Sequence, residues 1–410
     1  MCHMNQRKRE SILVILGAGA SWPIAPTTEE LTQKLAEWEY SWSPGVKPFG
    51  SFAVPSGGQK PNFEDFIGAL DEIRMRYSAK DSASYDLSLA LVEQWHPLND
   101  PVIPLAGAQE LNRQAFTELT LLPHEARVQV LSEIKKRIDT WTMDVLREAP
   151  INRLLRHLSE QFQCAVISLN YDPILDYSGL QLHHGFTDKD PTDTSYQLFN
   201  PRWEVTATGQ PLSDNETLFI PLHGSVHFGM RPKDAPPLLG IADPVWYEDI
   251  NTAANTWSPA SQGITRNDDV DILMVSGRHK AQTLMALPYA AYMAIFRRLT
   301  LTRNKWLIIG YGGQDYHVNA VLKQAILSQV VAGRQPSMVL VDKKDNRKSL
   351  NDLVRRIGLF DHVIQLRAPQ YDHGSWFPVI DGCAHIGWAN ADGVASAAEN
   401  VNTLVDYLKY

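Results

Sequence analysis

An apolar run that ends in a glycine-rich turn constrains the fold of this chain more than any other feature. Residues 11–21 read SILVILGAGAS, so leucine and β-branched side chains lead directly into Gly17 and Gly19. The run has the composition of a buried strand, and glycines, which lack Cβ atoms, let the backbone turn sharply into a following helix. Backbone N–H groups at the start of such a helix can hold a phosphate. The segment therefore predicts a strand, a tight turn and a helix, as a nucleotide site or as a structural turn alone.

The spacing of these glycines argues against one large class of nucleotide enzymes. The dehydrogenase fingerprint G-x-G-x-x-G needs a third glycine three residues after the second, and Trp22 stands there. We therefore do not expect an enzyme that transfers hydride.

Further apolar segments end in polar or glycine residues, as the first one does. They read QCAVISLNYD (163–172), TLFIPLHGS (217–225), DILMVSG (271–277), KWLIIGYGG (305–313) and SMVLVDKK (337–344). Recurrence of strand, polar loop and helix is typical of an α/β protein with helices on both faces of a parallel sheet. We predict a Rossmann-like, doubly wound parallel sheet whose ligands bind beyond the carboxyl ends of the strands.

The segments between these strands differ in character. Thr27 or Thr28 can cap a helix that begins EELTQKLAEW. Apolar residues then recur at helical spacing through much of residues 63–156, which predicts a helical insertion after the first strand and helix. Residues 187–217 and 231–269 are rich in Pro, Asp, Asn and Thr, and we predict long loops there.

Composition limits the compartment and the partners. The three cysteines of this chain of 410 residues are too few and too scattered for a disulfide framework, which suits a reducing compartment, so we predict a cytoplasmic protein. No apolar run approaches the roughly 18 residues of a membrane span, and no membrane association is expected. The net charge of -8 does not favour direct nucleic-acid binding.

Four short motifs follow predicted strands and carry the residues suited to chemistry. They are GAGAS (17–21), LNYD (169–172), LHGS (222–225) and IGYGGQD (309–315). Because the carboxyl ends of parallel strands meet at one edge of a sheet, we expect these motifs to converge although about 300 residues separate the first from the last.

This set of motifs resembles the sirtuin family, and more closely its bacterial sirtuin-like branch in antiphage defence systems. The elements that carry the resemblance are GAGAS with the following Pro26 and Thr27, the FEDFIGALDE helix, the NYD and LHG triplets, and the late IGYGGQD. The resemblance implies that residues 1–345 form an NAD-binding catalytic domain, which includes the helical insertion. Residues 346–410 then form a C-terminal extension of strand and helix that packs on it.

The resemblance also implies roles for particular residues. Asn170 would lie beside the nicotinamide ribose, His223 would contact the ribose hydroxyls, and Asp172 would orient the loop or a water molecule. NAD would be bound by two sets of residues, the glycine loop on its phosphates and the late motif on its adenosine side: Gly17, Ala18, Gly19, Ala20, Ser21 and Thr27, and Gly310 and Asp315.

These residue types suit cleavage of the nicotinamide glycosidic bond. An amide such as Asn170 can position water against an oxocarbenium-like centre without a competing proton equilibrium. Nicotinamide leaves as a neutral molecule and needs little general acid, so one histidine that acts on a ribose hydroxyl or on the water is adequate. His223 has a suitable pKa range for that role.

Each of these residues also has a structural interpretation. Asn170 can cap a following helix, and His223 can be a hydrogen-bonded core histidine. His183 and His184 compete with His223 for the role of base, while His317 begins a helix that Asp315 caps. His223 and His227 have the H-x-x-x-H spacing, but Gly224 and the strand end argue against one helical face, so no metal site is predicted.

The chain departs from the sirtuin pattern in a way that bears on the reaction. Protein-deacylating sirtuins carry a zinc domain with two Cys-x-x-Cys pairs, which Cys2, Cys164 and Cys383 cannot build, so no zinc is expected. An enzyme that uses water as the acceptor is then favoured. The hypothesis is an NAD+ glycohydrolase that releases nicotinamide and ADP-ribose and depletes NAD in abortive infection.

Other functions remain open at this point. They are an NAD-dependent protein deacylase or ADP-ribosyltransferase, a sensor of NAD or ADP-ribose without chemistry, and a nuclease with Mg²⁺ held by Asp269 and Asp271. The resemblance implies control by a homo-oligomer or by a partner, with a HerA-family ATPase as the first candidate.

Overall fold

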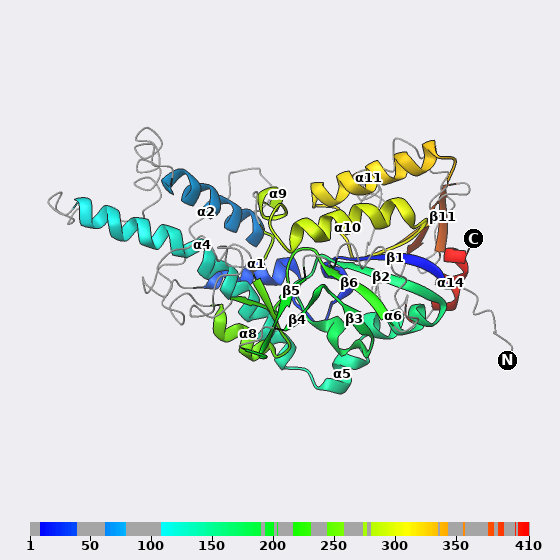
Figure 1. The fold of residues 1–410 in the computed structure, drawn as a ribbon, viewed down its shortest axis with the longest axis horizontal. Helices are drawn as coiled ribbons and strands as arrows, with labels where there is room; N and C mark the ends of the chain where they lie inside the picture. Colours follow the sequence, from blue (N-terminus) through cyan, green and yellow to red (C-terminus); the bar gives the residue numbers. More distant parts are fainter. Residues whose placement is uncertain are drawn as a thin grey trace.

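The computed structural model describes a mixed α/β fold (Figure 1). The described residues are 9–38, 62–78, 108–189, 193–200, 203, 216–230, 244–257, 274–276, 280–334, 337–342, 356, 376–380, 384–388, 398 and 401–409.

The main sheet has eight strands in the order β11-β12-β10-β9-β1-β2-β6-β3. Neighbouring strands are parallel throughout, except that β11 runs antiparallel to β12. This arrangement is compatible with a Rossmann-like fold and confirms the predicted parallel sheet. In chain order the strands are β1 (Glu10–Leu16), β2 (Phe162–Ser168), β3 (Gln181–His183), β6 (Glu216–Pro221), β9 (Lys305–Ile309), β10 (Ser337–Asp342), β11 (Trp376–Ile380) and β12 (Ala384–Trp388).

Strand β1 lies at the centre of this sheet because its sequence can be buried on both faces. Its side chains from Ile12 to Ile15 are fully buried, which is why the run lacks the apolar and polar alternation of a half-exposed strand. Leu16, its last residue, pairs with Ser168 of β2 and with Ile309 of β9. The three strands therefore end side by side, and the turns that follow them meet.

Helices pack on the sheet and also extend away from it. Figure 1 shows α10 and α11 on one side of the sheet and α6 on the other, while α2 and α4 project beyond its edge. A buried ion pair of 2.5 Å between Asp71 and Arg127 joins α2 to α4. The bounds are α1 (Thr28–Glu37), α2 (Phe63–Ser78), α4 (Ala108–Asp139), α5 (Met143–Arg147), α6 (Pro150–Gln161), α10 (Tyr289–Thr302), α11 (Tyr316–Val331) and α14 (Val401–Lys409). The interpretation of residues 63–156 as an insertion stays a prediction.

The start of α1 follows the sequence prediction. Thr27 is the N-cap, its side chain accepts a hydrogen bond from the backbone N–H of Glu30, and the Glu30 carboxylate accepts one from the Thr27 N–H. This reciprocal pair satisfies two N–H groups that a helix start otherwise leaves free. The prediction of a helix directly after the glycine turn was wrong. A 3-10 turn of three residues, η1 (Ala18–Ala20), stands there, and the α-helix begins only at Thr28.

The prediction of long loops over residues 187–217 and 231–269 was also wrong in part. These segments contribute to a second, antiparallel sheet of four strands in the order β4-β5-β8-β7, and to a short helix. Its strands are short, and aromatic side chains pack against one another to bury them. Because polar residues dominate the composition of these segments, the sequence did not indicate strands there. The elements are β4 (Phe186–Lys189), β5 (Tyr196–Phe199), β7 (Phe228–Met230), β8 (Pro244–Tyr247) and α8 (Ile250–Thr256).

Two further expectations can be compared with the structure. Of the predicted strand at 271–277, the described part forms a single bridge between Met274 and Gly224. The described helices include none that combines the length and the apolar character needed to cross a membrane.

Candidate functional site

A cavity of about 430 Å³ lies at the carboxyl ends of β1, β2, β6 and β9. This volume lies within the range of small-molecule sites. Residues 17–19, 169–172 and 310–312, with His223 and Asp315, form one part of its wall. Thr27 of the α1 cap and Phe63 and Glu64 of α2 form another part. All four motifs of the sequence analysis therefore contribute to one cavity, as their positions after parallel strands predict.

The glycines of the first and last motifs are needed for close packing of two backbones. A Cβ atom on Gly17 would lie 2.5 Å from the Gly310 carbonyl oxygen, and one on Gly19 would lie 3.0 Å from the Gly310 Cα. Gly310 itself has φ +60, and a Cβ there would lie 2.3 Å from the Ala20 nitrogen. The turns after β1 and β9 thus touch directly, which no larger residue allows.

The glycine turn does not offer its amide groups to an anion in the way that the sequence suggested. The N–H of Gly17 donates to the Ile309 carbonyl, that of Gly19 to the Gly310 carbonyl, and that of Ala20 to the Gly17 carbonyl. These three donors are occupied, and a 3-10 turn rather than an α-helix follows them. The segment therefore lacks the free helix N-terminus that was expected to hold a phosphate. Ala20 is buried and, like Ser21, is not among the residues that line the cavity.

The Gly17 carbonyl fixes the orientation of the Asn170 side-chain amide. Its Nδ2 lies 3.0 Å from the Gly17 carbonyl oxygen and 3.0 Å from the Ser21 Oγ. Because a carbonyl can only accept, the amide nitrogen must face Gly17, and Oδ1 is the remaining polar atom of the side chain. Asn170 therefore lines the cavity with its amide orientation fixed and does not cap a helix; the 3-10 turn η3 (Ile174–Ser178) follows Pro173 instead.

Asp172 is coupled to Asn170 through Ser21. The Ser21 hydroxyl accepts from Asn170 and also hydrogen-bonds the Asp172 carboxylate, while the Ile174 N–H lies 3.2 Å from Asp172 Oδ1. Burial raises the pKa of Asp172 to about 6, against the effect of these hydrogen bonds, which favour the ionised form. Asp172 can therefore accept or release a proton close to neutral pH.

The raised pKa of Asp172 predicts how its replacement changes stability. Between its ordinary pKa of 3.8 and about 6, the folded chain holds a proton that the unfolded chain has lost, so Asp172 lowers stability as pH rises through this window. Asp172→Asn removes that cost. We expect the variant to gain on the order of 1 kcal/mol relative to the wild type between pH 4 and pH 7 in thermal denaturation, after allowance for partial exposure.

A control of opposite sign is available at Asp249. Its carboxylate caps α8 through the N–H and hydroxyl groups of Thr252, which lower its pKa. Asp249→Asn should therefore lose stability as pH rises, where Asp172→Asn gains it. A flat difference curve for Asp172→Asn would contradict the assignment of the raised pKa.

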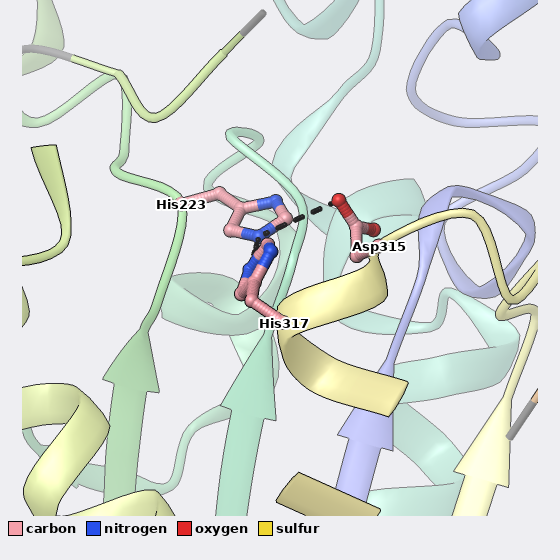
Figure 2. A group of neighbouring side chains, drawn as sticks. All are labelled: His223, Asp315 and His317. Atoms are coloured by element: carbon pink, nitrogen blue, oxygen red, sulfur yellow. Dashed lines mark hydrogen bonds and ion pairs between the residues drawn. The ribbon is translucent and has the colours of Figure 1, made fainter. Parts of the chain in front are cut away.

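His223, in the loop after β6, lies beside Asp315 and His317, which come from the start of α11 (Figure 2). Both histidines are buried. His223 Nε2 is 3.1 Å from His317 Nε2 and 3.9 Å from Asp315 Oδ1. Burial lowers the pKa of His223 well below its usual 6.5. It lowers that of His317 to about 4, so both imidazoles are neutral at pH 7.

Asp315 stands at the N-cap position of α11, as predicted, but its side chain makes no capping hydrogen bond. It lies 2.5 Å from the ammonium group of Lys280 instead, and Lys280 also lies 2.8 Å from Glu64 of α2. Burial alone would raise the pKa of Asp315, but the positive charges beside it, which are those of a protonated His223 and of Lys280, hold it below its usual value. Because His223 is neutral, the lasting positive charge beside Asp315 is that of Lys280.

Sequence reasoning missed Lys280 and Glu64. Burial opposes the charge of Lys280, but the two carboxylates outweigh it and hold the pKa of the ammonium above its usual value. Glu64 belongs to the FEDFIGALDE segment, and its position in the first turn of α2 was the one signal that pointed to it. Nothing in the sequence around Lys280, where α9 (Lys280–Thr283) begins, marks it as a partner.

His223, Asp315 and His317 each offer one nitrogen or oxygen atom that could bind a metal, and these three atoms lie within 4.8 Å of one another. Two observations favour an ion-pair and hydrogen-bond network over a metal here. The Asp315 oxygen nearest to His223 already holds the Lys280 ammonium. His317 Nδ1 is buried without a partner, whereas a metal-binding histidine almost always donates its second N–H to an acceptor.

The described residues that line the cavity are acidic in balance. Four of them are Glu or Asp and none is Lys or Arg; the acidic residues are Glu29, Glu64, Asp172 and Asp315. Lys280, which pairs with Glu64 and Asp315 but does not line the cavity, neutralises part of this negative charge. The field at the cavity therefore favours a ligand with a cationic group near these carboxylates.

The competing histidines lie elsewhere. His183 pairs with Glu216 at 3.1 Å, and His184 stacks on Trp246 with ring centroids 4.1 Å apart. His227 also stacks on Trp246 and lies 2.9 Å from Asp176. None of the three lines the cavity, so His223 is the histidine that faces it. Asp269 and Asp271 fall outside the described residues.

The chain was also compared with known proteins. No protein-family model matches it, and no curated protein matches it. The assignment of a function therefore depends on the site itself and on the motifs.

Proposed function

We propose that this protein is an NAD+ glycohydrolase that releases nicotinamide and ADP-ribose. One observation carries the proposal: the fixed acceptor of Asn170 and the neutral imidazole of His223 line the same cavity, at the carboxyl edge of a parallel sheet. This is the pair of residues that the resemblance to sirtuin-like NADases assigns to the nicotinamide ribose.

The two residues divide the work that hydrolysis needs. Asn170 Oδ1 holds a water molecule through one of its hydrogens, because the Gly17 carbonyl prevents the amide from turning. His223 accepts a hydrogen bond from a ribose hydroxyl or from the water, and its lowered pKa keeps the imidazole neutral and able to do so. Asp172 titrates near pH 6 and can take the proton that the attacking water loses.

The acidic lining supports a cationic substrate group. The nicotinamide ring of NAD+ carries a positive charge that is lost when the glycosidic bond breaks, and Asp172 and Asp315 lie in the wall of the cavity. Carboxylates near that bond also stabilise the oxocarbenium-like centre that develops during cleavage. The NAD phosphates would be held by neutral donors, since no Lys or Arg is among the described lining residues.

The biological setting of the proposal rests on the resemblance alone. We propose that NAD depletion serves antiphage defence by abortive infection. Such an enzyme must be inactive in an uninfected cell, so control by oligomerisation or by a partner, with a HerA-family ATPase as the first candidate, belongs to the proposal.

The test is release of nicotinamide from NAD+ by the purified full chain, alone and with a candidate partner. His223→Ala should abolish release, whereas His183→Ala, which removes a histidine outside the cavity, should not. Steady release without any acceptor supports hydrolysis over transfer. Binding of NAD+ without release under every condition would overturn the proposal in favour of a transferase that needs an acceptor, or of a sensor.

A further inference from the structure

The pairing of His223 with His317 requires one ring to donate and the other to accept. The two Nε2 atoms are 3.1 Å apart and both rings are buried (Figure 2). Two neutral imidazoles at this distance share one proton, so one ring must donate and the other must accept. Which ring donates decides whether His223 carries a lone pair or a proton on Nε2.

The backbone of Leu169 supports one direction for this pair. Its contact with the His223 ring raises the pKa of the imidazole, which is the effect of a carbonyl that accepts from a ring N–H. Since Nε2 faces His317, the nitrogen that donates to Leu169 is Nδ1, and the Nε2 of a neutral His223 is then an acceptor. The shared proton therefore belongs to His317 Nε2. His317 Nδ1 is left as a bare lone pair, which agrees with its lack of a hydrogen-bond partner.

We infer that His317 is a positioning residue for His223: it donates its Nε2–H to His223 Nε2 and thereby holds His223 in the Nδ1–H tautomer with an accepting Nε2. The tautomer is inferred from the contacts of the two rings, and its use in catalysis rests on the proposed function. When substrate enters, a ribose hydroxyl or the attacking water takes over the place of the His317 donor on the same lone pair. His223 then needs no tautomer change before it accepts that hydrogen bond.

The charged groups around His223 work in both directions. Asp315 of the α11 cap favours a proton on His223, while Lys280 and the His317 ring disfavour it. Glu64 of α2 pairs with Lys280 on the side of this group. Because a donor to Nε2 stabilises the neutral ring, loss of the His317 donor should raise the pKa of His223.

The experiment measures His223 directly, by ¹⁵N NMR of the histidine rings across pH. The full-length wild type is compared with His317→Phe, which removes the donor. His317→Gln can retain a donor in the side-chain amide, and Tyr316→Phe alters the exposed neighbour in the same turn. We expect a protonless Nε2 on His223 in the wild type. In His317→Phe its midpoint should rise by about one pH unit, the equivalent of one ordinary hydrogen bond, with partial recovery in His317→Gln and no change in Tyr316→Phe.

The same variants give a second reading in the nicotinamide assay. The acid limb of kcat/KM should move up by the same amount in His317→Phe. A proton on His223 Nε2 in the neutral wild type, or an unchanged midpoint in a folded His317→Phe, would overturn the inference. If His317→Phe does not fold, the proton state of His223 Nε2 in the wild type decides alone. Absence of nicotinamide release would contradict the proposed function and leave the NMR result standing, so the two failures are distinguishable.

Discussion

Replacement of Asn170 by alanine is expected to lower nicotinamide release by about 10²-fold to 10³-fold, the effect of losing one preorganised polar group next to a developing charge. The variant removes the Oδ1 acceptor that faces the cavity and the Nδ2 donor that orients it against Gly17 and Ser21. Because the proposed hydrolysis uses Asn170 to hold the reacting water, the loss should fall on kcat, with little change in KM. The measurement is steady-state nicotinamide release at saturating NAD+.

Asn152 provides a matched control for this variant. It is another buried asparagine, and its Nδ2 donates to the carbonyls of Leu146 and Ile174, away from the residues that line the cavity. Asn152→Ala should lose stability as Asn170→Ala does, by about 1–3 kcal/mol for an orphaned buried acceptor, yet keep its kcat. If Asn152→Ala and Asn170→Ala lose activity in parallel, Asn170 is structural.

Gly310→Ala is expected to destabilise the fold by about 4 kcal/mol or more, and to leave little folded protein at 37 °C. Its φ of +60 disfavours any side chain, and the added Cβ would lie 2.3 Å from the Ala20 nitrogen and 2.4 Å from the Gly19 carbonyl carbon. These are backbone atoms that cannot rotate away. The turn after β9 would have to separate from the turn after β1. Both turns line the cavity, so its wall would be disrupted.

Two other glycines separate the causes of this effect. Gly333 has φ +69 with no atom within 4 Å of an added Cβ, so Gly333→Ala should cost only the conformational strain of about 1–2 kcal/mol. Gly312→Ala meets only Gln314 Cγ at 3.9 Å and should cost less than about 1 kcal/mol. Chemical denaturation of the three variants tests the order. Equal effects at Gly310 and Gly333 would mean that the contact between the two turns is dispensable.

The interaction between Asp315 and Lys280 shows where sequence reasoning stops. Asp315 was placed correctly at the start of a helix, and a cap was the expected use of its side chain. The carboxylate turns instead to an ammonium group that lies 35 residues earlier in the chain. Sequence distance contains no information on such a partner, since α9 and α11 come together only when their flanking segments pack.

The second sheet failed to appear in the sequence analysis for a related reason. Strands such as Tyr196–Phe199 and Pro244–Tyr247 are four residues long, too short for an apolar period to register, and are separated by polar segments. Their stability comes from aromatic contacts across strands, including Tyr196 against Tyr247 at 5.7 Å between ring centroids. These contacts exist only after the strands have paired.

The sequence by itself determined the parallel sheet and the meeting of its four motifs. Continuous apolar runs can be buried only between two covered faces, and parallel strands deliver their carboxyl ends to one edge. Tertiary structure alone decided what each motif residue does there. Gly17 and Gly19 allow the close approach of Gly310, the amides of the turn bond to neighbouring carbonyls, and His223 pairs with His317. Such roles depend on distances of about 3 Å between segments remote in the chain, and hydrogen bonds and steric contacts act only at that range.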